Sequence, residues 1–276
     1  MKKTSFFYKI IKAIVRFFIP RFNVAGMENL PDEPCIIVGN HSQMYGPVCC
    51  ELFFPGDHYT WCAAEMMHTS QVPAYAFNDF WSRKPAYIRW FFKLASYIIA
   101  PLASFVFNNA NCIGVYRGAH MRSTLKETLE RLENGSNIII FPEHDGEYNH
   151  IICDFQERFM DLADLYYDRT GKQLCFVPLY IAPQLDQMQI GKPVRYNASA
   201  GIKAERPRIK EYLMQSITDL AKDLPLHRVV PYRQTPKKMC PDNISGKPYG
   251  RLRKPVVDYR QLRPRLLSDP RFSHVK

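Results

Sequence analysis

Apolar residues follow two different spacings along this chain, one typical of strands and one of helices. Short segments rich in apolar residues predict strands at residues 34–39, 57–64, 111–117, 136–143, 173–183 and 187–196, of which 136–143 is of the buried type. Between them, apolar residues three and four positions apart predict helices over 120–135, 155–171 and 206–224. Strands that alternate with helices in this way predict an α/β fold, with a single mixed sheet flanked by helices.

The N-terminal segment has an amphipathic pattern. Lys9, Lys12 and Arg16 recur at spacings of three and four and share one helix face, while isoleucine, valine and phenylalanine fill the other. The apolar pattern covers only the 15 residues 5–19 before Pro20, which is too few to span a bilayer. We therefore expect residues 1–22 to form a helix in the membrane interface, with its cations toward the lipid headgroups. Packing of this helix on its own domain remains an alternative.

A second apolar stretch covers residues 86–107 and contains Arg89, Lys93 and Pro101. Because proline interrupts a helix, we expect two short helices that are broken near Pro101, with an aromatic face toward lipid. A single transmembrane helix is the alternative. Together with the N-terminal segment, this stretch favours a peripheral or monotopic membrane protein.

The net charge of +11 is concentrated at the two ends of the 276-residue chain. Residues 1–21 carry six lysines and arginines and no acidic residue, and residues 228–276 carry thirteen against three aspartates. We therefore divide the chain into the interfacial helix, a domain over 23–227 and a basic, loop-rich C-terminal tail over 228–276. Basic ends attract phosphate-rich surfaces, either anionic lipid or nucleic acid. Aromatic residues are not interleaved on a basic sheet face, so we expect an anionic membrane and no nucleic acid.

The eight cysteines include no pair at CxxC spacing and none with histidine at zinc-finger spacing. Several lie inside apolar runs, where a thiol behaves as a small hydrophobic group. This usage is typical of a reducing compartment and indicates no structural metal.

Polar residues with catalytic chemistry follow three of the predicted strands. They are Asn40-His41, Tyr116-Arg117 and Glu143-His144-Asp145. Functional groups in α/β sheets gather beyond the carboxyl ends of strands. From the residues alone, a histidine in such a place can be a base, a metal ligand or a structural group. The acidic and histidine residues of 143–150 could also ligate a metal, but Gly146 predicts a loop there and we expect no metal site.

The order of these residues resembles four sequence blocks of the lysophospholipid and glycerol-phosphate acyltransferase family. The resemblance extends roughly over residues 20–225. The family's NHxxxxD, arginine, FPEG and proline-containing blocks are matched in turn by Asn40-His41, Arg117, Phe141-Pro142-Glu143 and Pro178. Two positions depart from the family pattern. Gly46 replaces the aspartate of the first block, and no arginine follows the third block until Arg158.

The resemblance implies an O-acyltransferase of phospholipid biosynthesis or remodelling. It would move a fatty acyl group from an acyl-CoA or acyl-carrier-protein thioester to a hydroxyl of a lysolipid such as 1-acylglycerol-3-phosphate. In this family His41 would be the general base, because neutral imidazole can take the proton of the attacking hydroxyl at pH 7. Asn40, Arg117 and Glu143 would bind the acceptor. No cofactor is implied beyond the acyl donor.

The missing aspartate at position 46 requires another group to orient His41. Asp145 is the candidate orienting residue, and Glu143, Asp57 and a backbone carbonyl are alternatives. A catalytically inactive lipid-binding protein that keeps the acyltransferase fold is the alternative function. In either case we expect the protein at the cytoplasmic face of a membrane.

Overall fold

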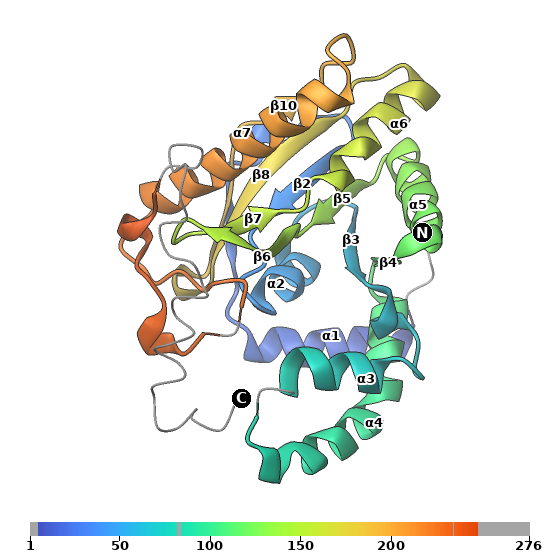
Figure 1. Cartoon of the computed structure of the whole chain (residues 1–276), viewed down its shortest axis with the longest axis vertical. Helices are drawn as coiled ribbons and strands as arrows, with labels where there is room; N and C mark the ends of the chain where they lie inside the picture. The colour runs from blue at the N-terminus through green and yellow to red at the C-terminus, as the bar shows by residue number, and fades with distance from the viewer. Residues whose placement is uncertain (1–4, 82–83, 234, 248–276) are drawn as a thin grey trace.

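The computed structural model describes residues 5–81, 84–233 and 235–247, and the remainder of the predicted basic tail lies outside these ranges. Its helices are α1 (Phe6–Phe18), α2 (Tyr45–Phe53), α3 (Val72–Ala76), α4 (Ala86–Asn109), α5 (Met121–Glu133), α6 (Asp161–Thr170) and α7 (Ile202–Asp223) (Figure 1). Its strands are β1 (Asn23–Ala25), β2 (Cys35–Gly39), β3 (His58–Ala63), β4 (Cys112–Val115), β5 (Asn137–Ile140), β6 (Glu143–Tyr148), β7 (Cys153–Phe155), β8 (Cys175–Ala182), β9 (Gln187–Ile190) and β10 (Val194–Arg195).

A mixed sheet forms the centre of the described chain. Its strands follow the order β1-β9-β8-β2-β5-β3-β4, and β10 pairs with β8. Strands β8, β2, β5, β3 and β4 are parallel, whereas β9 and β10 run antiparallel to β8. The predicted α/β class with a mixed sheet is confirmed. Because five neighbouring strands are parallel, their carboxyl ends share one edge of the sheet, where functional groups are expected.

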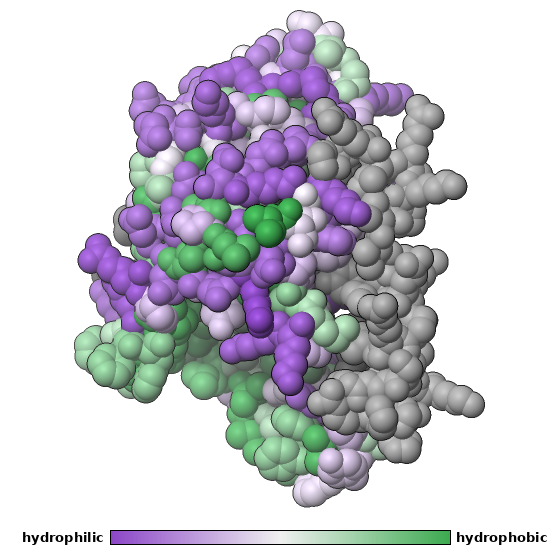
Figure 2. Space-filling model, turned by 90° about the vertical axis from the view of Figure 1, so that its left-hand side faces the viewer, coloured by the Kyte–Doolittle hydropathy of each residue, from purple (hydrophilic) through white to green (hydrophobic). Residues whose placement is uncertain are grey.

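Helices α1, α3 and α4 lie together at the lower end of the molecule in Figure 1. The exposed large apolar side chains of α1 and α4 are Phe6, Phe7, Ile10, Ile14, Phe17, Phe18, Tyr87, Trp90, Phe91, Leu94, Tyr97, Ile98, Ile99 and Leu102. Figure 2 shows apolar residues gathering toward this end of the molecule. A surface of this kind marks an interaction site. Among the described residues, α4 is the one helix whose length and composition would allow it to cross a bilayer.

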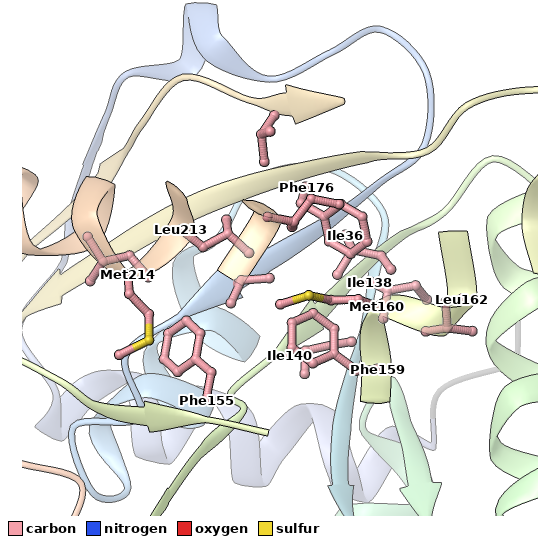
Figure 3. Close-up of a cluster of buried hydrophobic side chains, with 14 of the residues drawn as sticks. Ile36, Ile138, Ile140, Phe155, Phe159, Met160, Leu162, Phe176, Leu213 and Met214 are labelled. Carbon is pink, nitrogen blue, oxygen red and sulfur yellow. The ribbon is translucent and has the colours of Figure 1, made fainter. Parts of the chain in front are cut away.

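The central strands are buried on both faces. Ile36, Ile138 and Ile140 contact an apolar cluster that includes side chains of α5, α6 and α7 (Figure 3). Ile37 and Ile139, which point to the opposite face, belong to a second cluster with α2. Burial on both faces explains why these strands are continuous apolar runs rather than alternating patterns.

One residue of the predicted cationic face of α1, Lys12, points toward the protein, which differs from the prediction, whereas Lys9 and Arg16 are exposed. Lys12 Nζ lies 2.6 Å from Glu51 Oε1 on α2. The hydroxyl of Tyr8 donates to the same carboxylate at 2.8 Å. Because Glu51 pairs with Lys12 within the protein, the expectation that this cation faces lipid headgroups is wrong. Most of the exposed residues of α1 are apolar, and Lys9 and Arg16 are exposed beside them.

Helix α4 continues through Pro101, so the predicted break into two short helices is wrong. Tertiary contacts hold the helix on both sides of the proline. Ala100 is buried against Val72 and Ala76 of α3, and the hydroxyl of Ser104 donates to the carbonyl oxygen of Met67 at 2.9 Å. These contacts override the local preference of proline for a helix end.

The segment after β5 forms a hairpin rather than the predicted loop. Residues Glu143–Tyr148 form β6, which pairs antiparallel with β7 and contains an irregular register. Because β7 occupies Cys153–Phe155, α6 begins at Asp161, later than the predicted helix start at residue 155. The predicted helices at 120–135 and 206–224 are confirmed as α5 and α7.

Candidate active site

The carboxyl ends of β2 and β5 bring Asn40, His41 and Glu143 together. The two strands are parallel neighbours, with Val38 opposite Ile140. The polar residues that follow each strand therefore emerge side by side at one edge of the sheet.

Asn40 joins the end of β2 to β8. Its side chain is 2% exposed, its Oδ1 accepts the peptide N–H of Ile181 at 2.7 Å, and its Nδ2 donates to the carbonyl of Ile181 at 3.1 Å. The same amide nitrogen donates to Ser42 Oγ at 2.7 Å. Because both ends of the amide are occupied inside the protein, Asn40 positions its neighbours, and these contacts do not favour the predicted contact with substrate.

Glu143 holds the peptide of His41. The carboxylate is 4% exposed, with Oε1 accepting the His41 N–H at 2.6 Å and Oε2 accepting the Cys153 N–H at 2.7 Å. Burial raises the pKa of Glu143 to about 7, although both peptide N–H groups oppose this by favouring the charged form. Both oxygens are used internally, so the geometry gives Glu143 a positioning role in place of the predicted acceptor contact.

A left-handed turn directly after His41 orients its ring. Ser42 and Gln43 have φ values of 45° and 56°, a conformation that costs non-glycine residues roughly 1–2 kcal/mol each. The turn places the carbonyl oxygen of Gln43 in hydrogen-bond contact with His41 Nδ1. A carbonyl oxygen can only accept, so Nδ1 carries the proton of the neutral ring. The lone pair is therefore on Nε2.

The His41 ring lies between two aromatic side chains. Its centroid is 5.4 Å from that of Phe141 and 5.5 Å from that of Tyr232, both in edge-on arrangements. Burial lowers the pKa of His41, and the backbone contacts and the carboxylate of Asp79 only partly oppose this shift. His41 is therefore a neutral imidazole at pH 7, as a general base must be.

Gly46 leaves no space for the carboxylate that the family pattern places there. A Cβ atom at position 46 would lie 2.5 Å from the carbonyl oxygen of His41 and 3.0 Å from that of Asn40. The peptide N–H of Gly46 donates to the same His41 oxygen at 3.0 Å. Because the crowding atoms belong to the backbone, an aspartate cannot simply be restored at this position.

Asp145 does not occupy the predicted orienting position. Its carboxylate is exposed and pairs with the guanidinium of Arg233. The Glu143 carboxylate points inward and that of Asp145 points outward. Residues two apart on a regular strand would point the same way, and the irregular register of β6 accounts for the difference. The backbone carbonyl of Gln43 makes the orienting contact with the ring of His41, as in one of the alternatives drawn from the sequence.

Arg117 follows β4 at the same edge of the sheet and is exposed. It forms no hydrogen bond or ion pair with another described residue, so its guanidinium can bind a ligand. Burial and the carboxylate of Asp79 raise the pKa of Tyr75 to about 12. The positive charge of Arg117 is close enough to Tyr75 to oppose this increase. Arg117 and Asp79 therefore both lie near Tyr75, and the carboxylate of Asp79 also affects the pKa of His41.

Three contacts at this site had no signal in the sequence. Tyr232 and Arg233 come from the start of the predicted tail and lie beside residues almost two hundred positions earlier. Gln43 Nε2 donates to the carbonyl of Arg233 at 3.4 Å. Asp79 comes from a π-helical segment, Phe77–Trp81. Only a folded chain places these groups around His41.

The possible metal ligands of residues 143–150 do not converge. His144 Nε2 lies 3.5 Å from Asp154 Oδ2, and the Asp145 carboxylate pairs with Arg233. In the part of the chain that the structure describes, no group of three or more histidine, cysteine, aspartate or glutamate side chains is placed to hold a metal ion.

Similarity of this chain to known proteins is found among solved structures. No family model matches the chain, and no curated protein matches it in sequence. The crystal structure of PlsC, the 1-acyl-sn-glycerophosphate (LPA) acyltransferase from Thermotoga maritima, is similar with a TM-score of 0.45 and 17% sequence identity. The similarity covers 77% of this chain and 79% of that chain. At this level of similarity, the chemistry has to be argued from the contacts of this chain.

We expect Gly46→Ala to destabilise the fold. Helix propensity alone would favour alanine in α2 by about 1 kcal/mol. The backbone oxygen atoms at 2.5 and 3.0 Å oppose it, and overpacking of this kind typically costs roughly 1–3 kcal/mol. Urea denaturation should therefore show a lower unfolding free energy, whereas Met44→Ala, at the exposed residue that precedes α2, should change little. A more stable Gly46→Ala protein would show that position 46 has room for a side chain.

The raised pKa of Glu143 predicts a specific pH dependence of stability. A buried carboxyl whose pKa rises from 4.5 to about 7 stabilises the fold fully below pH 4.5 and loses that contribution as the pH rises to 7. Glu143→Gln cannot ionise, so its unfolding free energy should gain about 3 kcal/mol relative to the natural chain between pH 4.5 and 8. Glu147→Gln, on the exposed part of β6, is the matched control. Parallel pH curves for the natural and Glu143→Gln proteins would exclude the raised pKa.

Proposed function

We propose that this protein is an O-acyltransferase that acts on a lysolipid, with His41 as its general base. The observation that carries this proposal is the hydrogen bond of His41 Nδ1 to the Gln43 carbonyl, which leaves the Nε2 lone pair available. Glu143 fixes the peptide of the same residue at 2.6 Å. A fixed, neutral imidazole at the carboxyl edge of a parallel sheet suits proton abstraction from a hydroxyl.

In the proposed reaction, Nε2 of His41 takes the proton of the acceptor hydroxyl as its oxygen attacks the thioester carbonyl carbon. The C–S bond then breaks, and the imidazolium returns the proton to the departing thiolate. The thioester of acyl-CoA or acyl-carrier protein supplies the acyl group, and the scheme requires no metal or further cofactor. The Gln43 carbonyl, which accepts from Nδ1–H, stabilises the imidazolium as it forms.

Arg117 is the proposed contact for the acceptor phosphate. It is exposed at the end of β4, and it has no hydrogen-bond or ion-pair partner among the described residues. A guanidinium can bind phosphate through two parallel hydrogen bonds. A lysolipid with a phosphate beside its free hydroxyl, such as 1-acylglycerol-3-phosphate, fits this arrangement.

The outward apolar faces of α1 and α4 are the proposed membrane contact. Phe17 and Phe18 at the end of α1 are 83% and 77% exposed, and Trp90 on α4 is 68% exposed. Figure 2 shows apolar side chains gathered at this end of the molecule. Insertion of these side chains into the interface of a cytoplasmic leaflet would make the protein peripheral or monotopic and would bring it to its lipid acceptor.

An acyl-transfer assay tests the proposed function. Purified protein is incubated with labelled acyl thioesters and a panel of lysolipids, and the products are identified by lipid mass spectrometry. His41→Ala should reduce turnover by about 10²-fold or more, because it removes the proton acceptor. His120→Ala, on an exposed turn, should keep the natural turnover.

Turnover of His41→Ala within a few-fold of the natural chain would contradict the assignment of the base. If the natural chain binds vesicles but transfers no acyl group to any lysolipid of the panel, the lipid-binding alternative replaces the enzyme.

A further inference from the structure

A cavity of about 530 Å³ lies at the C-terminal end of α1, between that helix, β1 and the end of α2. Its apolar lining includes Phe22, Phe53 and Phe54, and its polar lining consists of Asn23 and two arginines, Arg16 and Arg21. No acidic side chain lines it. The volume is within the range of pockets that hold small ligands.

The two arginines of this cavity have no anionic partner among the described residues. Neither Arg16 nor Arg21 forms an ion pair or a side-chain hydrogen bond with another described residue. The guanidinium of Arg16 lies 5.5 Å from the ring centroid of Phe53, a cation–π contact that leaves its N–H groups free. Lys12, one turn earlier on α1, is instead paired with Glu51. The cavity therefore combines two positively charged side chains, unpaired among the described residues, with an apolar lining.

A structural explanation accounts for only part of this arrangement. Arg16 in the last turn of α1 can interact favourably with the negative end of the helix dipole. Arg21 lies beyond the end of the helix, and the dipole explains neither its place in the same cavity nor the absence of a carboxylate there.

The cavity lies next to the exposed apolar residues at the end of α1, and this position indicates which kind of anion it could bind. Phe17 and Phe18 point outward beside Arg16 in the sequence and are strongly exposed. An interfacial helix buries its apolar face about 5–10 Å into the boundary of headgroups and acyl chains, which leaves its polar flank among the phosphates. Arg16 is an exposed polar residue in the last turn of α1, and Arg21 lies in the short segment that follows the helix, so both are within a few residues of Phe17 and Phe18.

We propose that this cavity binds the phosphate of one anionic membrane lipid, with Arg16 and Arg21 holding the phosphate and the phenylalanine floor contacting the adjoining apolar part of the lipid. The inference rests on the proposed membrane contact of α1 and is independent of the reaction at His41.

The cavity is separate from the candidate active site. The first turn of α2 contacts the His41 turn, whereas the cavity contacts Phe53 at the opposite end of that helix. Nine helical residues span about 13 Å, so a lipid held by Arg16 is not the acceptor at His41. It would anchor the protein and select the membrane on which it works.

Vesicle sedimentation tests the proposal. The natural chain is compared on vesicles of phosphatidylcholine alone and of phosphatidylcholine with a minor fraction of phosphatidylglycerol. Two surface arginines near anionic lipid should favour the mixed vesicles by about 30-fold in affinity. Arg16→Gln/Arg21→Gln should lose most of this preference and keep its binding to phosphatidylcholine.

Lys9→Gln/Lys93→Gln is the matched control. Both lysines are exposed on the two apolar helices, and the variant removes the same charge without touching the cavity. It should keep most of the preference for mixed vesicles. Phe17→Ser/Phe18→Ser should weaken binding to both kinds of vesicle, because it removes the apolar contact.

Three results would overturn the proposal. Equal loss of preference in the arginine and lysine variants would show only a diffuse attraction between charges. Unchanged binding of Phe17→Ser/Phe18→Ser would place the membrane contact elsewhere. Saturable binding of inorganic phosphate that depends on Arg16 and Arg21, with no preference of the natural chain for anionic vesicles, would identify a soluble phosphate as the ligand. The acyl-transfer assay is independent of all three results.

Discussion

Two hydrogen bonds, one at the peptide N–H of His41 and one at its ring, fix the position and the protonation pattern of this histidine. The N–H of His41 is held by the buried carboxylate of Glu143, and Nδ1 of its ring is held by the carbonyl of Gln43 two residues later. In the sequence block that residues 40–46 resemble, the position of Gly46 holds an aspartate, which would orient the histidine. Here that position is packed against backbone oxygens, with no room for a Cβ. The left-handed turn at Ser42 and Gln43 therefore lets the backbone carbonyl of Gln43 orient the His41 ring in place of a carboxylate side chain.

Helix α2 connects this turn to the surface at which we place the membrane. At its start, the N–H of Tyr45 donates to the carbonyl of Ser42 at 3.1 Å. In its last turns, Glu51 holds Tyr8 and Lys12 of α1, and Phe53 forms part of the arginine-lined cavity. A single short helix thus fixes the orientation of α1 relative to His41. The proposed membrane contact and the proposed base are therefore parts of one packed unit.

Much of the fold could be predicted from the sequence because the central strands are buried on both faces and so appear as continuous apolar runs. The meeting of Asn40, His41 and Glu143 followed from the same pattern, since parallel strands share a carboxyl edge. Their individual roles did not follow. The irregular register of β6 turns Asp145 outward to Arg233, and the register of a hairpin cannot be counted from sequence spacing.

Other features depend on contacts between distant residues. Tyr232 packs on the His41 ring from the far end of the chain, and no local pattern indicates this. Pro101 should break a helix, but the packing of Ala100 on α3 keeps α4 continuous. Amphipathicity showed that α1 has a cationic and an apolar face. It could not show that Glu51 would turn Lys12 toward the protein and leave the apolar face outside.

The state of the His41 ring is the most direct test of this account. In nitrogen-15 NMR spectra of protein with labelled histidine side chains, with the His41 signals assigned by their loss in His41→Gln, the pH is varied across the neutral range. We predict that the neutral ring carries its proton on Nδ1 with Nε2 unprotonated, and that it titrates below the ordinary pKa of about 6.5. A neutral ring with its proton on Nε2, or a pKa above 6.5, would contradict the assignment of His41 as a base oriented by its own backbone.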